Sequence, residues 1–229
     1  NDLWGAPVEH WTWLGLLPGY LGREDASLLT MVSDFMNGAD GHSEGMLMHN
    51  HVALKEQILS WFETSHRPLV LFGVTWAILD WMAELHIENK WLDSIPWNRV
   101  TLVETGGMRG RGIEPIREEV HAQIWQRLPD IQIASEYGMT EMLSQGYAKD
   151  GLHHTFPKWV SPLVRDPRDP RRTLPEGRTG RVDVVDLANV HSCAFLATSD
   201  AAQWRPEGLK LLGRMDHAEV RGCSLLVSE

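Results

Sequence analysis

The pattern of apolar and polar positions predicts alternating strands and helices in the first 150 residues. Helical periodicity covers 27–38, with Asp25 as the expected cap, and about 52–62. Apolar runs with strand composition lie further on, at 68–74, 99–104 and 131–137. Helices are expected between these strands, at 76–85 with Thr75 as cap, and from an opening at Glu114-Pro115, with Pro115 near the first turn, to 128. Strands joined by helices pair in parallel, so an α/β fold with a parallel sheet is expected.

The pattern changes after residue 150. A stretch rich in proline and charge, 165–180, predicts an exposed loop. Short strands without long helices between them are expected at 180–188, 194–200 and 209–214. The sequence therefore predicts two parts: residues 1–150 with parallel-sheet α/β layers, and residues 151–229 as a small β-rich subdomain.

Composition and charge exclude several classes of protein. The chain has 229 residues, 43% of them hydrophobic, which is ordinary for a globular protein. Its net charge of -10 argues against nucleic-acid or membrane binding through bulk positive charge. The longest uncharged apolar run, 69–79, is shorter than the roughly 20 residues that span a bilayer. Two cysteines make no disulfide framework, so a cytoplasmic location is expected.

The segment SEYGMTE (135–141) is the sharpest candidate for chemistry. A strand is expected to end at Glu136, and Gly138 follows in a turn. The ring of Tyr137 can stack on a base, the hydroxyl of Thr140 can bond a phosphate oxygen, and the carboxylate of Glu141 suits Mg²⁺. These groups together can hold a nucleoside triphosphate. A simple turn with a buried tyrosine is the alternative.

Two later charges fit the same ligand. Asp200 is expected just after a strand, where its carboxylate can accept both hydroxyls of a ribose. Arg214 is expected after the next strand, and its planar fork suits phosphate or ribose oxygens. Taken alone, each residue is better explained as a surface charge.

Three further features are weaker. The turn with Gly106 and Gly107, within ETGGMRGRG, lies between a strand and a helix, but its spacing matches no phosphate-binding fingerprint. Cys223 is a candidate nucleophile beside Arg221, or else a small buried residue, and Cys193 is expected in the core. The histidines show no metal-binding spacing.

SEYGMTE, LATSDAA and LLGRMD, in this order, resemble motifs of the adenylate-forming superfamily of acyl-activating ligases. The turn ETGGMRG, the opening LLPGYLGREDASLLTMV and the ending EVRGCSLL resemble one branch of it, the acyl-protein synthetases of bacterial bioluminescence. Phenylacetate-CoA ligase is a more distant cousin. The resemblance runs from about Leu16 to Leu226 and implies the large-domain part of the adenylate-forming ligase fold.

The resemblance also implies a role for each motif residue. Tyr137 would stack on adenine, Thr140 would contact the α-phosphate and Glu141 would hold magnesium. Asp200 would bind the ribose hydroxyls, and Arg214 would bridge ribose and phosphate. The remaining roles concern the acyl group: Gly106 and Gly107 would line the acyl or adenine pocket, and Cys223 would take the acyl group as a thioester.

The implied reaction is ATP- and Mg²⁺-dependent. A fatty acid, or another carboxylic acid, becomes an acyl-adenylate, and the acyl group passes to a protein cysteine and then to a reductase partner. A CoA ligase and a nucleotide-binding protein without catalysis are the alternatives. The family also has a Ser/Thr/Gly-rich phosphate loop upstream, for which ADGHSEG (39–45) is no substitute. The chain is therefore expected to lack roughly the first third of a family member, as a truncated product, a processed fragment or a short relative.

Overall fold

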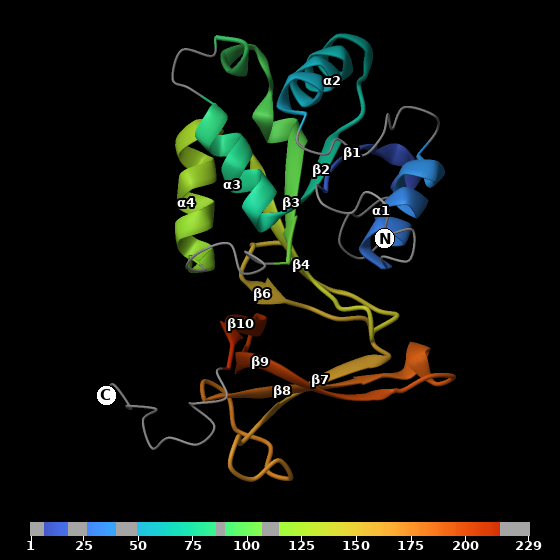
Figure 1. The fold of residues 1–229 in the computed structure, drawn as a ribbon, viewed down its shortest axis with the longest axis vertical. Coiled ribbons are helices and arrows are strands. Elements are labelled where there is room, and N and C mark those ends of the chain that lie inside the picture. The colour runs from blue at the N-terminus through green and yellow to red at the C-terminus, as the bar shows by residue number, and fades with distance from the viewer. Residues whose placement is uncertain (1–6, 18–26, 40–49, 86–89, 107–114, 216–229) are drawn as a thin grey trace. The chain divides into compact units, whose positions relative to one another are not determined.

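The computed structural model describes residues 7–17, 27–39, 50–85, 90–106 and 115–215. The chain divides into two compact units, Asn1–Glu136 and Tyr137–Glu229, called unit 1 and unit 2 below. Unit 1 combines helices with a parallel sheet, whereas unit 2 is built on an antiparallel sheet (Figure 1). The predicted α/β fold with a β-rich second part is therefore confirmed. No helix in the described ranges combines the length and apolar character needed to cross a membrane.

Unit 1 is organised around a parallel sheet in the order β1-β2-β3-β4. The strands are β1 (Thr12–Leu16), β2 (Leu69–Val74), β3 (Val100–Thr105) and β4 (Gln132–Tyr137). Every residue of the first three is buried, which explains their nearly continuous apolar runs. The parallel pairing is as predicted. The sequence pattern missed β1, because a five-residue strand with Thr and Gly among its positions gives a weak signal.

Four helices accompany this sheet: α1 (Ser27–Gly38), α2 (His51–Thr64), α3 (Thr75–Glu84) and α4 (Arg117–Arg127). The described residues of unit 1 also form three short 3₁₀ turns: η1 (Val8–His10), η2 (Leu92–Ser94) and η3 (Trp97–Arg99). Helices α3 and α4 lie beside each other in Figure 1. All four helices were predicted, but two details at their ends were wrong. Thr75 makes no cap bond, because its hydroxyl binds Glu104 instead, and Pro115 precedes Ile116, the N-cap of α4.

Unit 2 is an antiparallel sheet in the order β6-β10-β9-β8-β7. Its elements are β5 (Gly146–Ala148), β6 (His153–His154), β7 (Val160–Arg165), β8 (Thr179–Asp186), η4 (Leu187–Asn189), β9 (Phe195–Arg205) and β10 (Gly208–Arg214). Buried and partly exposed residues alternate along β8, so one face of the strand is covered. The predicted strands correspond to β8, β9 and β10, and the loop predicted at 165–180 lies mainly between β7 and β8.

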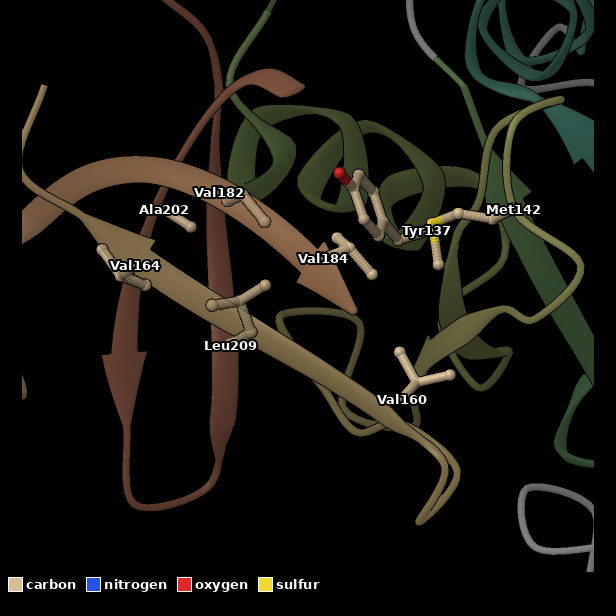
Figure 2. Close-up of a cluster of buried hydrophobic side chains, with 8 residues drawn as sticks. All are labelled: Tyr137, Met142, Val160, Val164, Val182, Val184, Ala202 and Leu209. Carbon is tan, nitrogen blue, oxygen red and sulfur yellow. The ribbon is translucent and has the colours of Figure 1, made fainter. Parts of the chain in front are cut away.

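The buried face of this sheet carries a compact apolar core (Figure 2). Its members are Tyr137, Met142, Val160, Val164, Val182, Val184, Ala202 and Leu209. Tyr137 ends β4 and Met142 lies in the turn that follows, so this core also packs the segment that carries the SEYGMTE motif. The candidate turn is therefore anchored to the β-sheet of unit 2.

Candidate functional site

Unit 2 brings three of the candidate residues together. The hydroxyl of Tyr137 donates a hydrogen bond of 2.7 Å to Oδ2 of Asp200. The other carboxylate oxygen, Oδ1, lies 3.6 Å from Nε of Arg214. Tyr137 ends β4, Asp200 lies in β9 and Arg214 ends β10, so segments far apart in the sequence converge on one carboxylate.

A β-bulge sets the pairing of Asp200 with Arg214. The register of β9 and β10 shifts between Leu211 and Gly213, and after the shift Arg214 stands opposite Asp200. Gly213 has a φ of 111°, which L side chains rarely adopt, so glycine is the residue suited to this position. Asp200 was expected just after a strand. This was wrong: β9 runs on to Arg205, because the segment stays paired with β8 and β10.

The surroundings fix the protonation of Tyr137 and leave Arg214 accessible. Burial, reinforced by the negative charge of Asp200, raises the pKa of Tyr137 above its usual range, so its hydroxyl remains a donor. The side chain of Asp200 is 21% exposed, whereas that of Arg214 is 76% exposed. An exposed ion pair contributes little to stability. Arg214 can therefore turn to an anionic ligand at small cost.

The ring of Tyr137 is more enclosed than the stacking role implies. The residue is 9% exposed, and the rings of His154 and Phe156 approach it edge-on, with centroids 6.2 Å away. A buried tyrosine was the alternative left open by the sequence. The structure combines that burial with a polar task, the orientation of the Asp200 carboxylate.

The turn between β4 and β5 carries the remaining residues of the motif. Gly138, Thr140 and Glu141 are exposed there. The backbone carbonyl of Glu141 accepts a hydrogen bond of 2.5 Å from Nδ2 of the Asn189 side chain. Within the described ranges, no three His, Cys, Asp or Glu side chains gather as a metal site. Glu141 is thus a single carboxylate available to an incoming ion.

A separate polar cluster lies at the carboxyl ends of β2, β3 and β4 in unit 1. Glu104, 2% exposed, accepts hydrogen bonds from Thr75 and Ser135 and is paired with Arg117 at 2.8 Å. Glu136, on the neighbouring strand β4, accepts a hydrogen bond from Thr105. Burial raises the pKa of Glu136 to about 7. The bond from Thr105 opposes this shift and the charge of Glu104 adds to it.

The other predicted site residues have different outcomes. Gly106 follows β3 with a φ of 70°, so this turn needs a glycine. Gly107 and Cys223 lie outside the described residues. Cys193 was expected in the core, and this was wrong: it is exposed, because it lies in the loop after η4.

Sequence reasoning missed the buried polar residues around these turns. Glu104, Asp186 and Asn189 are at most 5% exposed. A signal was present for two of them, because Glu104 closes an apolar run and Asp186 precedes a short turn as an N-cap.

No family model and no curated protein matches the chain. Solved structures do match, although their identity is low. The ATP-bound RpMatB-BxBclM chimera B3 is 15% identical, with a TM-score of 0.63, over 93% of this chain and 42% of that one. The anthranilate CoA ligase AuaEII with anthranoyl-AMP is 14% identical, with a TM-score of 0.58, over 93% of this chain and 42% of that one. A structure from a study of fatty acyl-adenylate ligases from E. coli and L. pneumophila is 12% identical, with a TM-score of 0.59, over 90% of this chain and 44% of that one.

These neighbours are adenylate-forming ligases, and the chain has their fold. It spans less than half the length of each of these three structures.

Proposed function

We propose that this chain is the nucleotide-binding part of an enzyme that activates a carboxylic acid as an acyl-adenylate. The observation that carries the proposal is the carboxylate of Asp200, held by Tyr137 and facing Arg214, in a chain with the adenylate-forming ligase fold. Neighbours described as bound to ATP and to anthranoyl-AMP support the same chemistry.

The proposed roles follow from the donors and acceptors. Tyr137 uses one acceptor position of Asp200, and the carboxylate retains others for the ribose hydroxyls. Arg214, exposed and planar, binds ribose or phosphate oxygens. Thr140 offers a hydroxyl to the α-phosphate. The adenine contacts what remains open of the Tyr137 ring.

Magnesium fits Glu141. Mg²⁺ is usually held by one or two carboxylates together with substrate phosphates, so a single exposed glutamate on the turn suffices as the protein ligand. When bound, the ion would offset the negative charge of the phosphates.

In the proposed reaction, a carboxylate oxygen of the acid attacks the α-phosphorus of ATP. The bond from that phosphorus to pyrophosphate breaks, which leaves the acyl-adenylate. Thr140 and Arg214 lower the repulsion between the two anions, because each directs donors at the phosphate. A thiol then attacks the acyl carbonyl, and AMP leaves.

The acceptor of the acyl group defines two versions of the proposal. In the first, suggested by the sequence resemblance, a fatty acyl group passes to Cys223 and then to an acyl-protein reductase. In the second, CoA is the acceptor. The match to a structure described as a CoA ligase supports this second version.

The test is ATP-dependent activation by the purified 229-residue chain. Labelled fatty and aromatic acids are incubated with ATP and Mg²⁺, and AMP release is measured. Protein-bound label that hydroxylamine removes, and that Cys223→Ala abolishes, supports the first version. Release of AMP that depends on CoA supports the second. ATP binding without AMP formation points to a binding protein without catalysis.

A matched pair of variants tests the site. Asp200→Asn should weaken ATP binding by roughly ten- to hundredfold, because hydrogen bonds to a charged acceptor are lost. Asp183→Asn makes the same change at a carboxylate on β8 that is also 21% exposed and also paired with arginines. It should leave ATP binding unchanged. If the two variants change ATP binding equally, Asp200 is not part of the nucleotide site.

A further inference from the structure

The turn that carries Thr140 and Glu141 lies between β4 and β5, outside any helix or strand. Its internal backbone bond joins the amide of Met142 to the carbonyl of Met139, at 3.0 Å. Ligand-binding turns need a fixed backbone, because a displacement of about 1 Å can cost about a hundredfold in rate. Two buried side chains next to β8 supply further anchors.

The first anchor is Asp186, the last residue of β8, which is fully buried. Its Oδ2 accepts hydrogen bonds of 3.0 Å from the backbone amides of Leu143 and Ser144. Its Oδ1 accepts bonds from the hydroxyl of Ser144 at 2.8 Å and from the amide of Ala188 at 3.1 Å. Both oxygens are thus engaged with donors, and charge-assisted bonds of this kind are strong.

The second anchor is Asn189, the last residue of η4, which is 5% exposed. Its Nδ2 donates to the carbonyl of Glu141 at 2.5 Å and to the carbonyl of Cys193 at 2.9 Å. Asn189 therefore ties the backbone of Glu141 to the loop after η4 while the side chain of Glu141 remains exposed.

We propose that Asp186 and Asn189 are positioning residues that hold the 140–144 turn so that Thr140 and Glu141 meet the phosphates and Mg²⁺. This inference rests on the proposed function. Neither residue is expected to touch the nucleotide, since their side chains are buried and occupied by backbone groups. Asp200, which would bind the ribose, is on β9 and makes none of these contacts.

Because Asp200 and the turn make separate contacts, changes at the turn should alter the affinity for Mg·ATP but not the affinity for adenosine. Adenosine engages the Asp200 side of the site, whereas Mg·ATP also needs the turn. Asn189→Ala should raise the Kd for Mg·ATP about tenfold, the effect of losing its two hydrogen bonds, and leave the Kd for adenosine unchanged. Gln203→Ala is the matched control, because it also removes a side-chain amide bond in unit 2, at 2.9 Å to Thr179.

Binding of both ligands is measured by calorimetry on the full chain. A wild-type chain that binds neither nucleotide overturns the proposed function and this inference with it. If the wild-type chain binds both ligands and Asn189→Ala behaves like Gln203→Ala, the inference alone is overturned. Equal losses for both ligands indicate a general structural role and also overturn it.

Hydrogen exchange supplies a measurement that needs no ligand. Asp186→Asn keeps the size of the side chain but replaces one acceptor oxygen with an NH₂ group. That group cannot accept the hydrogen bonds from the backbone amides and the hydroxyl that the carboxylate oxygens accept. It should speed exchange at the amides of Leu143 and Ser144 at least about tenfold, without altering the strands β9 and β10. Unchanged protection of both amides would mean that Asp186 does not hold the turn.

Discussion

Replacing the buried carboxyl group of Glu136 should change how stability depends on pH. Glu136 is 6% exposed, and its pKa in the folded chain is raised from 4.5 to about 7, chiefly by burial. The folded state therefore binds a proton at Glu136 more tightly than the unfolded state does. This contribution to stability is fully present below pH 4.5 and is lost as the pH rises through about 7.

The magnitude follows from the two pKa values. Each unit of difference corresponds to about 1.4 kcal/mol, so the full effect is about 3 kcal/mol, and most of it falls between pH 5 and pH 8. Glu136→Gln removes the titration, and its amide oxygen can still accept the bond from Thr105. The variant should therefore gain stability relative to the wild type as the pH rises.

The assay is urea unfolding of the full chain at pH 5 and pH 8 and constant ionic strength. Tryptophan fluorescence reports on unit 1, since every tryptophan except Trp159 and Trp204 belongs to it. Glu119→Gln, at an exposed position of α4, is the control and should shift stability equally at both pH values. The reasoning fails if the difference between Glu136→Gln and the wild type is the same at pH 5 and pH 8.

Three further changes test other parts of the structure. Gly213→Ala forces a residue with a side chain to adopt a φ of 111°, which costs about 1–3 kcal/mol, so ATP affinity measured by calorimetry should fall severalfold. Gly38→Ala is the control: this helical position has open space for the added methyl group, and ATP affinity should not fall. Trp81→Ala empties a site that is 1% exposed and should lower the free energy of unfolding by about 3–5 kcal/mol, as measured in urea. Glu141→Gln should raise the Mg²⁺ concentration needed for half-maximal ATP binding, with adenosine binding unchanged; equal loss of both would contradict its role.

The sequence pattern predicted the layers of the fold because local signals suffice for them. A continuous apolar run such as 69–74 predicts a strand buried on both faces, and the helices between such runs require parallel pairing. The same logic predicted which residues lie near the ends of the strands. It failed for Asp200, because the length of β9 depends on its pairing with two other strands.

The side-chain partnerships within the candidate site depend on long-range register. Tyr137 and Asp200 are 63 positions apart, and Arg214 reaches the same carboxylate because of a one-residue bulge. Composition and periodicity carry no information on such a bulge, apart from the glycine at 213. The resemblance of the three motifs implies that Tyr137, Asp200 and Arg214 serve one nucleotide, because a resemblance draws on a whole fold rather than on a local pattern. That shared role stays a prediction.

The buried carboxylates were missed for another physical reason. Glu104, Glu136 and Asp186 each lie at or near the end of an apolar strand, where a local pattern predicts exposure to water. Each is buried because nearby donors replace that water: hydroxyl groups bind the two glutamates, and backbone amides with one hydroxyl bind the aspartate. The useful sequence signal is therefore a carboxylate at a strand end together with Ser or Thr on a neighbouring strand end. Thr105 beside Glu136 and Ser135 beside Glu104 fit that pattern across β3 and β4, whose register pairs Glu104 with Ser135 and Thr105 with Glu136.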